Sequence, residues 1–232
     1  TSELPKQYNK VESSELYDKL FRIPLFTGMS RDELERVVSR TCFDYHKVDE
    51  GEIVARQGER CGQLMLLIDG TLELSATSEG HIYEVTEWVH APAILEQAAV
   101  FGLNQRFAHT MKSTTQANLI TLDKTELLKL TTASFVFRLN IFNSLATALQ
   151  KQQQGLWATC PASLTDRVIN FFFDHVTLRY GHKVFHIKMT DLADQLNDRR
   201  LNVSHVLNDL RDKQLLTFSR GRIDIPKLEA LR

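Results

Sequence analysis

Short runs of alternating apolar and polar residues, separated by glycines, fill the chain from about residue 42 to residue 123. They read, in order, CFDYHKV, EIVARQ, QLMLLI, TLELSA, IYEVTEW and NLITL. Alternation with a period of two is typical of strands with one buried face, and short strands at this spacing favour an antiparallel sandwich or roll. Asp69-Gly70 predicts a tight turn between two of these strands. Ahead of them, SRDELERVV predicts a helix capped by Ser30.

A long helical segment follows the predicted strands. Its apolar residues recur at alternating spacings of four and three, at Phe135, Leu139, Phe142, Ala146, Leu149 and Leu156, with Gln153 as the polar interruption. A heptad-like seam of this kind favours pairing with a second helix, and the same helix of a second copy is the simplest partner. The open alternative is that the stripe packs on the chain's own β roll.

The C-terminal segment predicts a helix-turn-helix followed by a hairpin. MTDLADQLNDRRLNVSHVLNDLR contains two helical stretches around a turn near Asn197-Asp198, and LLTFSRGRIDI predicts two strands around Arg220-Gly221. A hairpin directly after the second helix is a wing. We therefore expect an α+β protein: a β roll (jelly roll) with N-terminal helices (1–130), a dimerisation helix and hinge (131–160), and a winged helix-turn-helix (161–232).

The second helix of this motif has one apolar face, formed by Val203, Val206, Leu207 and Leu210, which we expect to be buried. We expect the exposed side of this helix and the wing to contact a partner, which for a helix-turn-helix is double-stranded DNA. The candidate residues are Arg199, Arg200, Leu201, Asn202, Ser204, His205, Arg220 and Arg222. Arg200 is the best candidate for base recognition, because a guanidinium can form two hydrogen bonds with guanine in the major groove. The wing arginines are placed for the phosphate backbone.

Composition and charge agree with this interpretation. The residues from 161 onward hold 12 Lys and Arg against 9 Asp and Glu, although the whole chain has a formal charge of −1.

Three scattered cysteines and the absence of a long apolar run favour the cytoplasm over export or a membrane. The histidines are dispersed without an HxH pair, so we expect no metal site and no enzyme activity.

The whole pattern resembles the catabolite activator and fumarate–nitrate regulator (Crp/Fnr) superfamily. The segments that carry the resemblance are LFTGMSRDELERVV, EIVARQGERCGQLMLLIDGTLELSA, ILEQAAVFGLNQRFA and DLADQLNDRRLNVSHVLNDLRDKQLLTFSRGRIDI. The resemblance covers nearly the whole chain. It implies a bacterial homodimer that binds palindromic operators, is controlled through its cyclic-nucleotide-binding-type β roll and often contacts RNA polymerase.

The resemblance also implies a candidate effector pocket. Glu96 and Arg106 match the residues that bind the ribose and the cyclic phosphate in the nucleotide-binding members, but Leu95 and Phe107 replace small residues there. We therefore expect that a cyclic nucleotide is disfavoured as the ligand, and that Glu96 and Arg106 pair with each other. In the second helix, Leu201 stands where members of the superfamily commonly have Glu, so their operator sequences cannot be transferred. The alternative function is a sensor or scaffold module with a vestigial DNA-binding domain.

Overall fold

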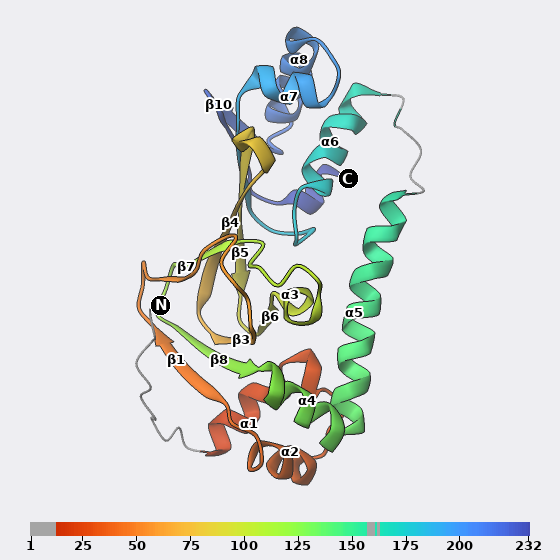
Figure 1. Cartoon of the computed structure of the whole chain (residues 1–232). Helices are drawn as coiled ribbons and strands as arrows, with labels where there is room; N and C mark the ends of the chain where they lie inside the picture. The colour runs from red at the N-terminus through yellow and green to blue at the C-terminus, as the bar shows by residue number, and fades with distance from the viewer. Residues whose placement is uncertain (1–12, 157–160, 162) are drawn as a thin grey trace. The chain divides into compact units, whose positions relative to one another are not determined.

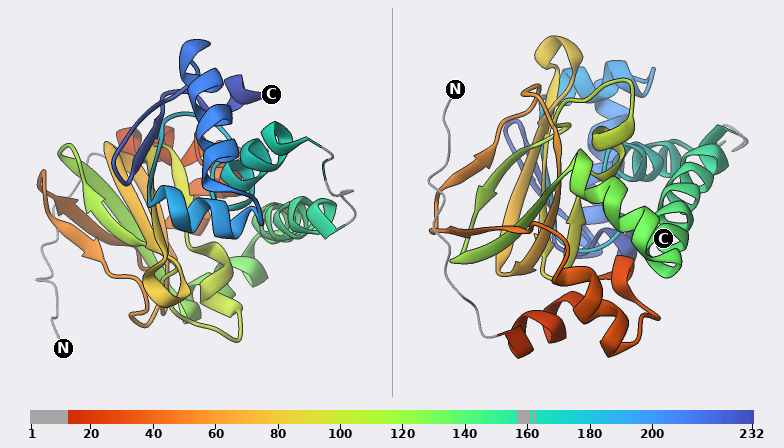
Figure 2. Two further views of the ribbon diagram at one scale, coloured as in Figure 1. Left: turned by 90° about the horizontal axis from the view of Figure 1, so that it is seen from above. Right: turned by 60° about the horizontal axis from the view of Figure 1, so that its bottom comes forward.

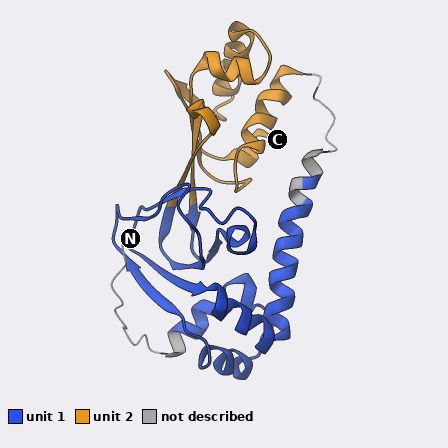
Figure 3. Cartoon of the chain, in the orientation of Figure 1, with its two compact units in different colours: residues 1–72, 89–153 blue, residues 73–88, 154–232 orange. Residues whose placement is uncertain are grey.

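The computed structural model describes residues 13–156, 161 and 163–232. It divides into two compact units: residues 1–72 with 89–153, and residues 73–88 with 154–232 (Figure 3). The chain therefore passes between the units three times. This grouping differs from the predicted domain limits, which assigned residues 73–88 to the β roll. Those limits stay a prediction, and the expected hinge before residue 161 lies partly outside the described residues.

The first unit is the expected antiparallel β roll (Figure 1). One of its sheets has the strand order β1-β8-β3-β6, and β2 pairs with β7. The strands that begin in this unit are β1 Asp44–Val48, β2 Ile53–Ala55, β3 Gln63–Asp69, β4 Thr71–Thr77, β6 Ala93–Leu95, β7 Thr110–Ser113 and β8 Ala117–Asp123. The alternation predicted most of them, whereas β6 and β7 were not predicted.

The helices that begin in this unit are α1 Ser13–Phe21, α2 Arg31–Val38, α3 Gln97–Phe101, α4 Lys124–Ala133 and α5 Phe135–Leu156, with a short 3-10 turn at Pro24–Phe26. The N-terminal helices α1 and α2 lie at one end of the roll, which the right-hand view of Figure 2 brings forward. The predicted cap is present, because the Ser30 hydroxyl accepts a hydrogen bond from the backbone N–H of Glu33. Ser134, before α5, donates to the Glu33 carboxylate at 2.6 Å and so connects α2 with α5.

Helix α5 has two apolar faces. Phe137 and Ile141 are buried in the core of the first unit. The predicted seam lies on the other face: Phe135, Leu139, Phe142, Ala146 and Leu149 are all exposed. The stripe therefore does not pack on the chain's own roll over these residues, which corrects the alternative. The side chain of Leu156 lies outside the described residues.

The second unit contains the helix-turn-helix and the wing. Its elements are α6 Leu164–Asp174, β9 Lys183–Ile187, α7 Met189–Gln195, α8 Arg200–Asp212, β10 Thr217–Ser219, β11 Arg222–Ile225 and the 3-10 turn Leu228–Leu231. Strand β5, Tyr83–His90, pairs with β9, which pairs in turn with β11. Apolar side chains of α6, α8 and these strands form one core, with Phe172, Phe185, Val203 and Leu207 at its centre.

The Asp69-Gly70 turn is present as predicted and depends on a glycine. Gly70 has φ +89°, and a Cβ atom there would lie 2.7 Å from the carbonyl oxygen of Gln116. Gly58 has nearly the same φ, +83°, but apart from its two chain neighbours no described residue has an atom within 4 Å of such a Cβ. The two positions therefore separate the cost of a left-handed backbone from the cost of a steric clash.

We predict that Gly70→Ala destabilises the roll more than Gly58→Ala. The left-handed conformation costs about 1 kcal/mol in either variant, and the clash at Gly70 adds about 1–3 kcal/mol. Native-state hydrogen exchange of the β3 amides measures both costs in the first unit. Equal losses in the two variants would mean that the chain relaxes around position 70.

Candidate nucleic-acid interface

Helix α8 is oriented by its apolar face. Val203, Val206, Leu207 and Leu210 are buried in the core of the second unit, as the sequence pattern predicts. An amphipathic helix that buries this stripe must present its opposite side to solvent. Arg199, Arg200, Asn202 and His205 are accordingly exposed, Ser204 is half-buried, and Leu201 is 67% exposed. The predicted contact surface of α8 is therefore available to a partner.

The turn before α8 is fixed by a set of hydrogen bonds that sequence reasoning missed. The Arg167 guanidinium in α6 donates to the carbonyl oxygen of Leu196 at 2.8 Å and to Asp198 Oδ2 at 2.6 Å. Asp198 Oδ1 accepts from the Asn202 amide at 2.9 Å and from the backbone N–H of Arg199 at 2.8 Å. Asn202 thus holds the start of α8 with its amide nitrogen.

These hydrogen bonds also set the charge of the turn. The bonds from Asn202, from the Arg199 backbone and from Arg167 hold the pKa of Asp198 below its usual value. A carboxylate that accepts several N–H groups is stabilised in its charged form. Asp198 therefore remains an acceptor at neutral pH. Because its partners come from α6 and from α8, it anchors α8 to the rest of the unit.

A groove of about 940 Å³ brings α8 together with the wing. Arg200 and Ser204 line it from α8, and Arg220 lines it from the β10–β11 turn. Lys188 and Thr190, at the start of α7, line the same groove and were not among the predicted residues. A lysine directly before the first helix of the motif could have indicated them. The arginine, lysine and hydroxyl-bearing side chains that line this groove are of the kinds that commonly bind phosphate oxygens.

The second wing arginine has a different environment. Arg222 donates to Asp224 Oδ2 at 2.9 Å, and the other carboxylate oxygen of Asp224 is 2.9 Å from His182 Nε2. Burial alone would raise the pKa of Asp224, but the hydrogen bonds from Arg222 and His182 lower it. Asp224 is therefore a charged competitor for the Arg222 guanidinium. Arg220 and Arg222, which the sequence treats alike, differ in this respect.

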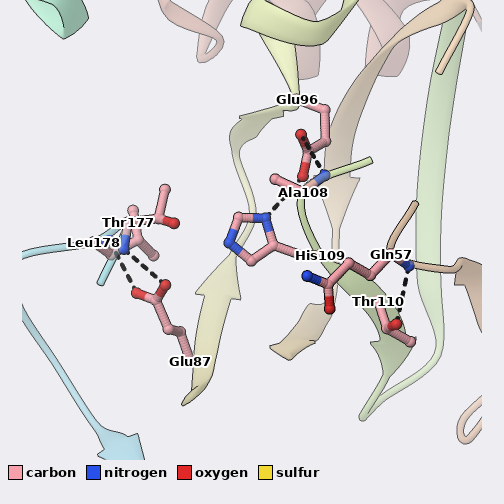
Figure 4. A network of polar contacts seen from close by, with 8 residues as sticks. All are labelled: Gln57, Glu87, Glu96, Ala108, His109, Thr110, Thr177 and Leu178. Carbon is pink, nitrogen blue, oxygen red and sulfur yellow. Dashed lines mark hydrogen bonds and ion pairs between the residues drawn. The ribbon is translucent and has the colours of Figure 1, made fainter. Parts of the chain in front are cut away.

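The structure contradicts the predicted pairing of Glu96 with Arg106. Glu96 has a left-handed backbone with φ 53°, and its carboxylate lies 2.8 Å from His109 Nδ1 and accepts from the backbone N–H of Ala108 at 3.3 Å (Figure 4). Arg106 instead donates to the carbonyl oxygen of Gly58 at 2.6 Å. The signal that sequence reasoning missed is His109, which lies beyond the motif that carried the resemblance.

These contacts do not fit a cyclic nucleotide. Both carboxylate oxygens of Glu96 already have partners within the protein, and the Arg106 guanidinium is bound to a backbone oxygen. Leu95 is buried and Phe107 is half-buried, so both add bulk beside these two residues. A ribose and a phosphate would have to displace the internal partners of Glu96 and Arg106.

Within the described residues, no group of three or more His, Cys, Asp or Glu side chains is placed to hold a metal ion. Among the helices that the structure describes, none is both long and apolar enough to cross a membrane.

Two family models match the chain. The cyclic nucleotide-binding domain matches residues 45–134, and the Crp-like helix-turn-helix domain matches residues 166–232. Together they span well over half of the 232 residues, with the β-roll domain first and the helix-turn-helix domain second. No curated protein matches the chain in sequence.

Solved structures share the fold. The catabolite activator protein of Thermus thermophilus is 19% identical with a TM-score of 0.51, over 90% of this chain and 96% of that chain. The sensor domain of the regulator DNR from Pseudomonas aeruginosa is 18% identical with a TM-score of 0.51, over 64% of this chain and 97% of that domain. With both family models matched, the chain belongs to the Crp/Fnr superfamily of transcription regulators.

Proposed function

We propose that the protein is a sequence-specific DNA-binding transcription regulator that acts as a homodimer. The observation that carries this proposal is the groove in which Arg200 and Ser204 of α8 meet Arg220 of the wing. A helix fits the major groove of B-DNA, and basic side chains beside it neutralise phosphates. In this arrangement Arg200 reads a base, whereas Lys188 and Arg220 bind the backbone.

The proposal of a homodimer rests on α5. Its exposed apolar residues lie at the spacing of a helix pair, and Phe142 is 61% exposed. A two-fold dimer presents two copies of α8 and so recognises a palindromic operator with half-sites about 10 base pairs apart. Control by a small molecule in the β roll and contact with RNA polymerase follow from the resemblance, and a cytoplasmic location follows from the cysteine pattern. All three stay predictions.

The alternative of a module with a vestigial DNA-binding domain has less support. Such a module has no need of an outward-facing basic helix, yet Arg200 and His205 are exposed on α8. The anchoring of the turn by Arg167 and Asp198 also keeps α8 in a defined orientation. Both features are understandable if α8 binds DNA.

Replacement of Arg200 tests base recognition. We predict that Arg200→Ala weakens binding by about 1–3 kcal/mol at one base position in each half-site, because the guanidinium no longer binds that base. Affinities for single-base variants of a selected operator measure the effect. Arg211→Ala, at the other end of α8, is the matched control and leaves base preference unchanged. Uniform weakening over all sequences by Arg200→Ala would assign this residue to phosphate instead.

Replacement of Asp224 tests the state of the wing. We predict that Asp224→Asn strengthens DNA binding, because Arg222 is released from its carboxylate partner. The plot of log affinity against log salt concentration should steepen by about 0.9 for each new phosphate contact.

The double variant Asp224→Asn/Arg222→Ala separates this effect from the loss of a negative charge. It removes the released arginine, so the added slope should disappear. A wild-type slope in Asp224→Asn alone would show that Arg222 does not reach the DNA.

Replacement on α5 tests the dimer. We predict that Phe142→Glu makes the protein monomeric, because two carboxylates would face each other across an apolar seam. Thr147→Glu, which lies away from the seam on the same exposed helix, should remain dimeric. Sedimentation velocity distinguishes the two states. If Phe142→Glu remains dimeric, the interface lies elsewhere.

A further inference from the structure

Residues 73–88 form a hairpin that packs within the C-terminal unit, although the sequence places it between strands of the roll (Figure 3). Strand β5 pairs antiparallel with β9 over five residue pairs, from Tyr83 opposite Ile187 to Glu87 opposite Lys183. It thus covers the edge of β9 that β11 leaves free. The hairpin is therefore part of the sheet to which the wing belongs.

The hairpin also contributes to the core of this unit. Val85 is 4% exposed and belongs to the same apolar cluster as Phe172 and Phe185. The Tyr83 ring meets the rings of Phe171 and His175 edge-on, with centroid distances of 5.7 and 5.1 Å. Removing β5 would expose this side of the core to water, which is unfavourable for apolar surface.

Glu87 connects the hairpin to the loop before β9. Its carboxylate is buried and accepts hydrogen bonds from the backbone N–H groups of Thr177 at 2.8 Å and Leu178 at 2.9 Å (Figure 4). It also lies 3.4 Å from Nζ of Lys183, whose side chain is wholly buried and donates to the carbonyl oxygen of Tyr180. Burial lowers the pKa of Lys183, and the neighbouring Glu87 opposes that shift. Without Glu87, a buried ammonium group would lose its ion-pair partner.

A second set of contacts runs from the hairpin toward the wing. The Trp88 ring stacks on His182 with a centroid distance of 4.4 Å and an interplanar angle of 3°. His182 is hydrogen-bonded to Asp224, which binds Arg222. The hairpin therefore adjoins the residues that hold the second wing arginine.

We propose that the hairpin of residues 73–88 is a constitutive part of the DNA-binding domain, which stays paired with β9 when the protein binds DNA. This inference rests on the proposed function. Detachment would break the β5–β9 ladder, expose Val85 and leave the partners of Glu87 without an acceptor. Because residues 72 and 89 belong to the first unit, the hairpin is a second covalent route, besides α5, by which the roll acts on the DNA-binding unit.

A disulfide across the ladder tests whether the hairpin must leave. Thr86 and Val184 are directly opposite each other, and such pairs have the Cα separation that a disulfide requires. We expect oxidised Thr86→Cys/Val184→Cys to bind DNA within twofold of the reduced form, with each single-cysteine variant as a control. Loss of DNA binding on oxidation, restored by reductant, would overturn the proposal.

Hydrogen exchange tests the same inference without DNA. In the full-length wild-type protein, the β5 amides of residues 83–87 should be as protected as those of β9. Glu87→Gln should raise exchange at Thr177 and Leu178 about tenfold or more, whereas Glu84→Gln, on the other face of β5, should not.

Two possible results distinguish a failure of this inference from a failure of the proposed function. Fast exchange of β5 beside a protected β9 would contradict the integrated hairpin, whatever the DNA result. Protected β5 amides in a protein that binds no DNA at low salt would leave the hairpin in the C-terminal unit but refute its role in a DNA-binding domain.

Discussion

The burial of one face of α8 is the constraint on which the functional surface depends. Val203, Val206, Leu207 and Leu210 must leave water, and the core formed by α6, β9 and β5 is where they do so. Once that face is fixed, helix geometry determines which side chains point outward. The polar anchoring of Asp198 by Arg167 then defines where the helix begins. The exposed arginines are a consequence of this packing.

The same core explains why the hairpin of residues 73–88 contributes to the stability of the second unit. A small unit has little apolar surface to bury, so each strand that covers its core contributes a large share of its stability. Strand β5 supplies Val85, Tyr83 and a buried carboxylate to a unit that otherwise begins about seventy residues later in the sequence. A segment that lies between strands of the roll in the sequence is therefore part of the core of the second unit.

Sequence reasoning predicted those parts whose signal is local. Neighbouring residues alone indicate the alternating strands, the Ser30 cap, the turn at Gly70 and the amphipathic face of α8. Strand β9 was missed because KVFHI is mostly buried and does not alternate, and because its lysine reads as a surface residue although it is buried. The partners of Glu96 and Glu87 could not be predicted, since tertiary contacts decide them; Glu87 binds backbone groups 90 and 91 residues away.

Selection from a pool of random DNA duplexes tests whether α8 recognises a specific DNA sequence. Purified full-length protein is incubated with the pool at low salt, and the bound duplexes are sequenced. We expect enrichment of an inverted repeat whose half-site centres lie about 10 base pairs apart, one helical turn. Retention of no DNA, or of duplexes without any common sequence, would contradict the conclusion that α8 reads an operator.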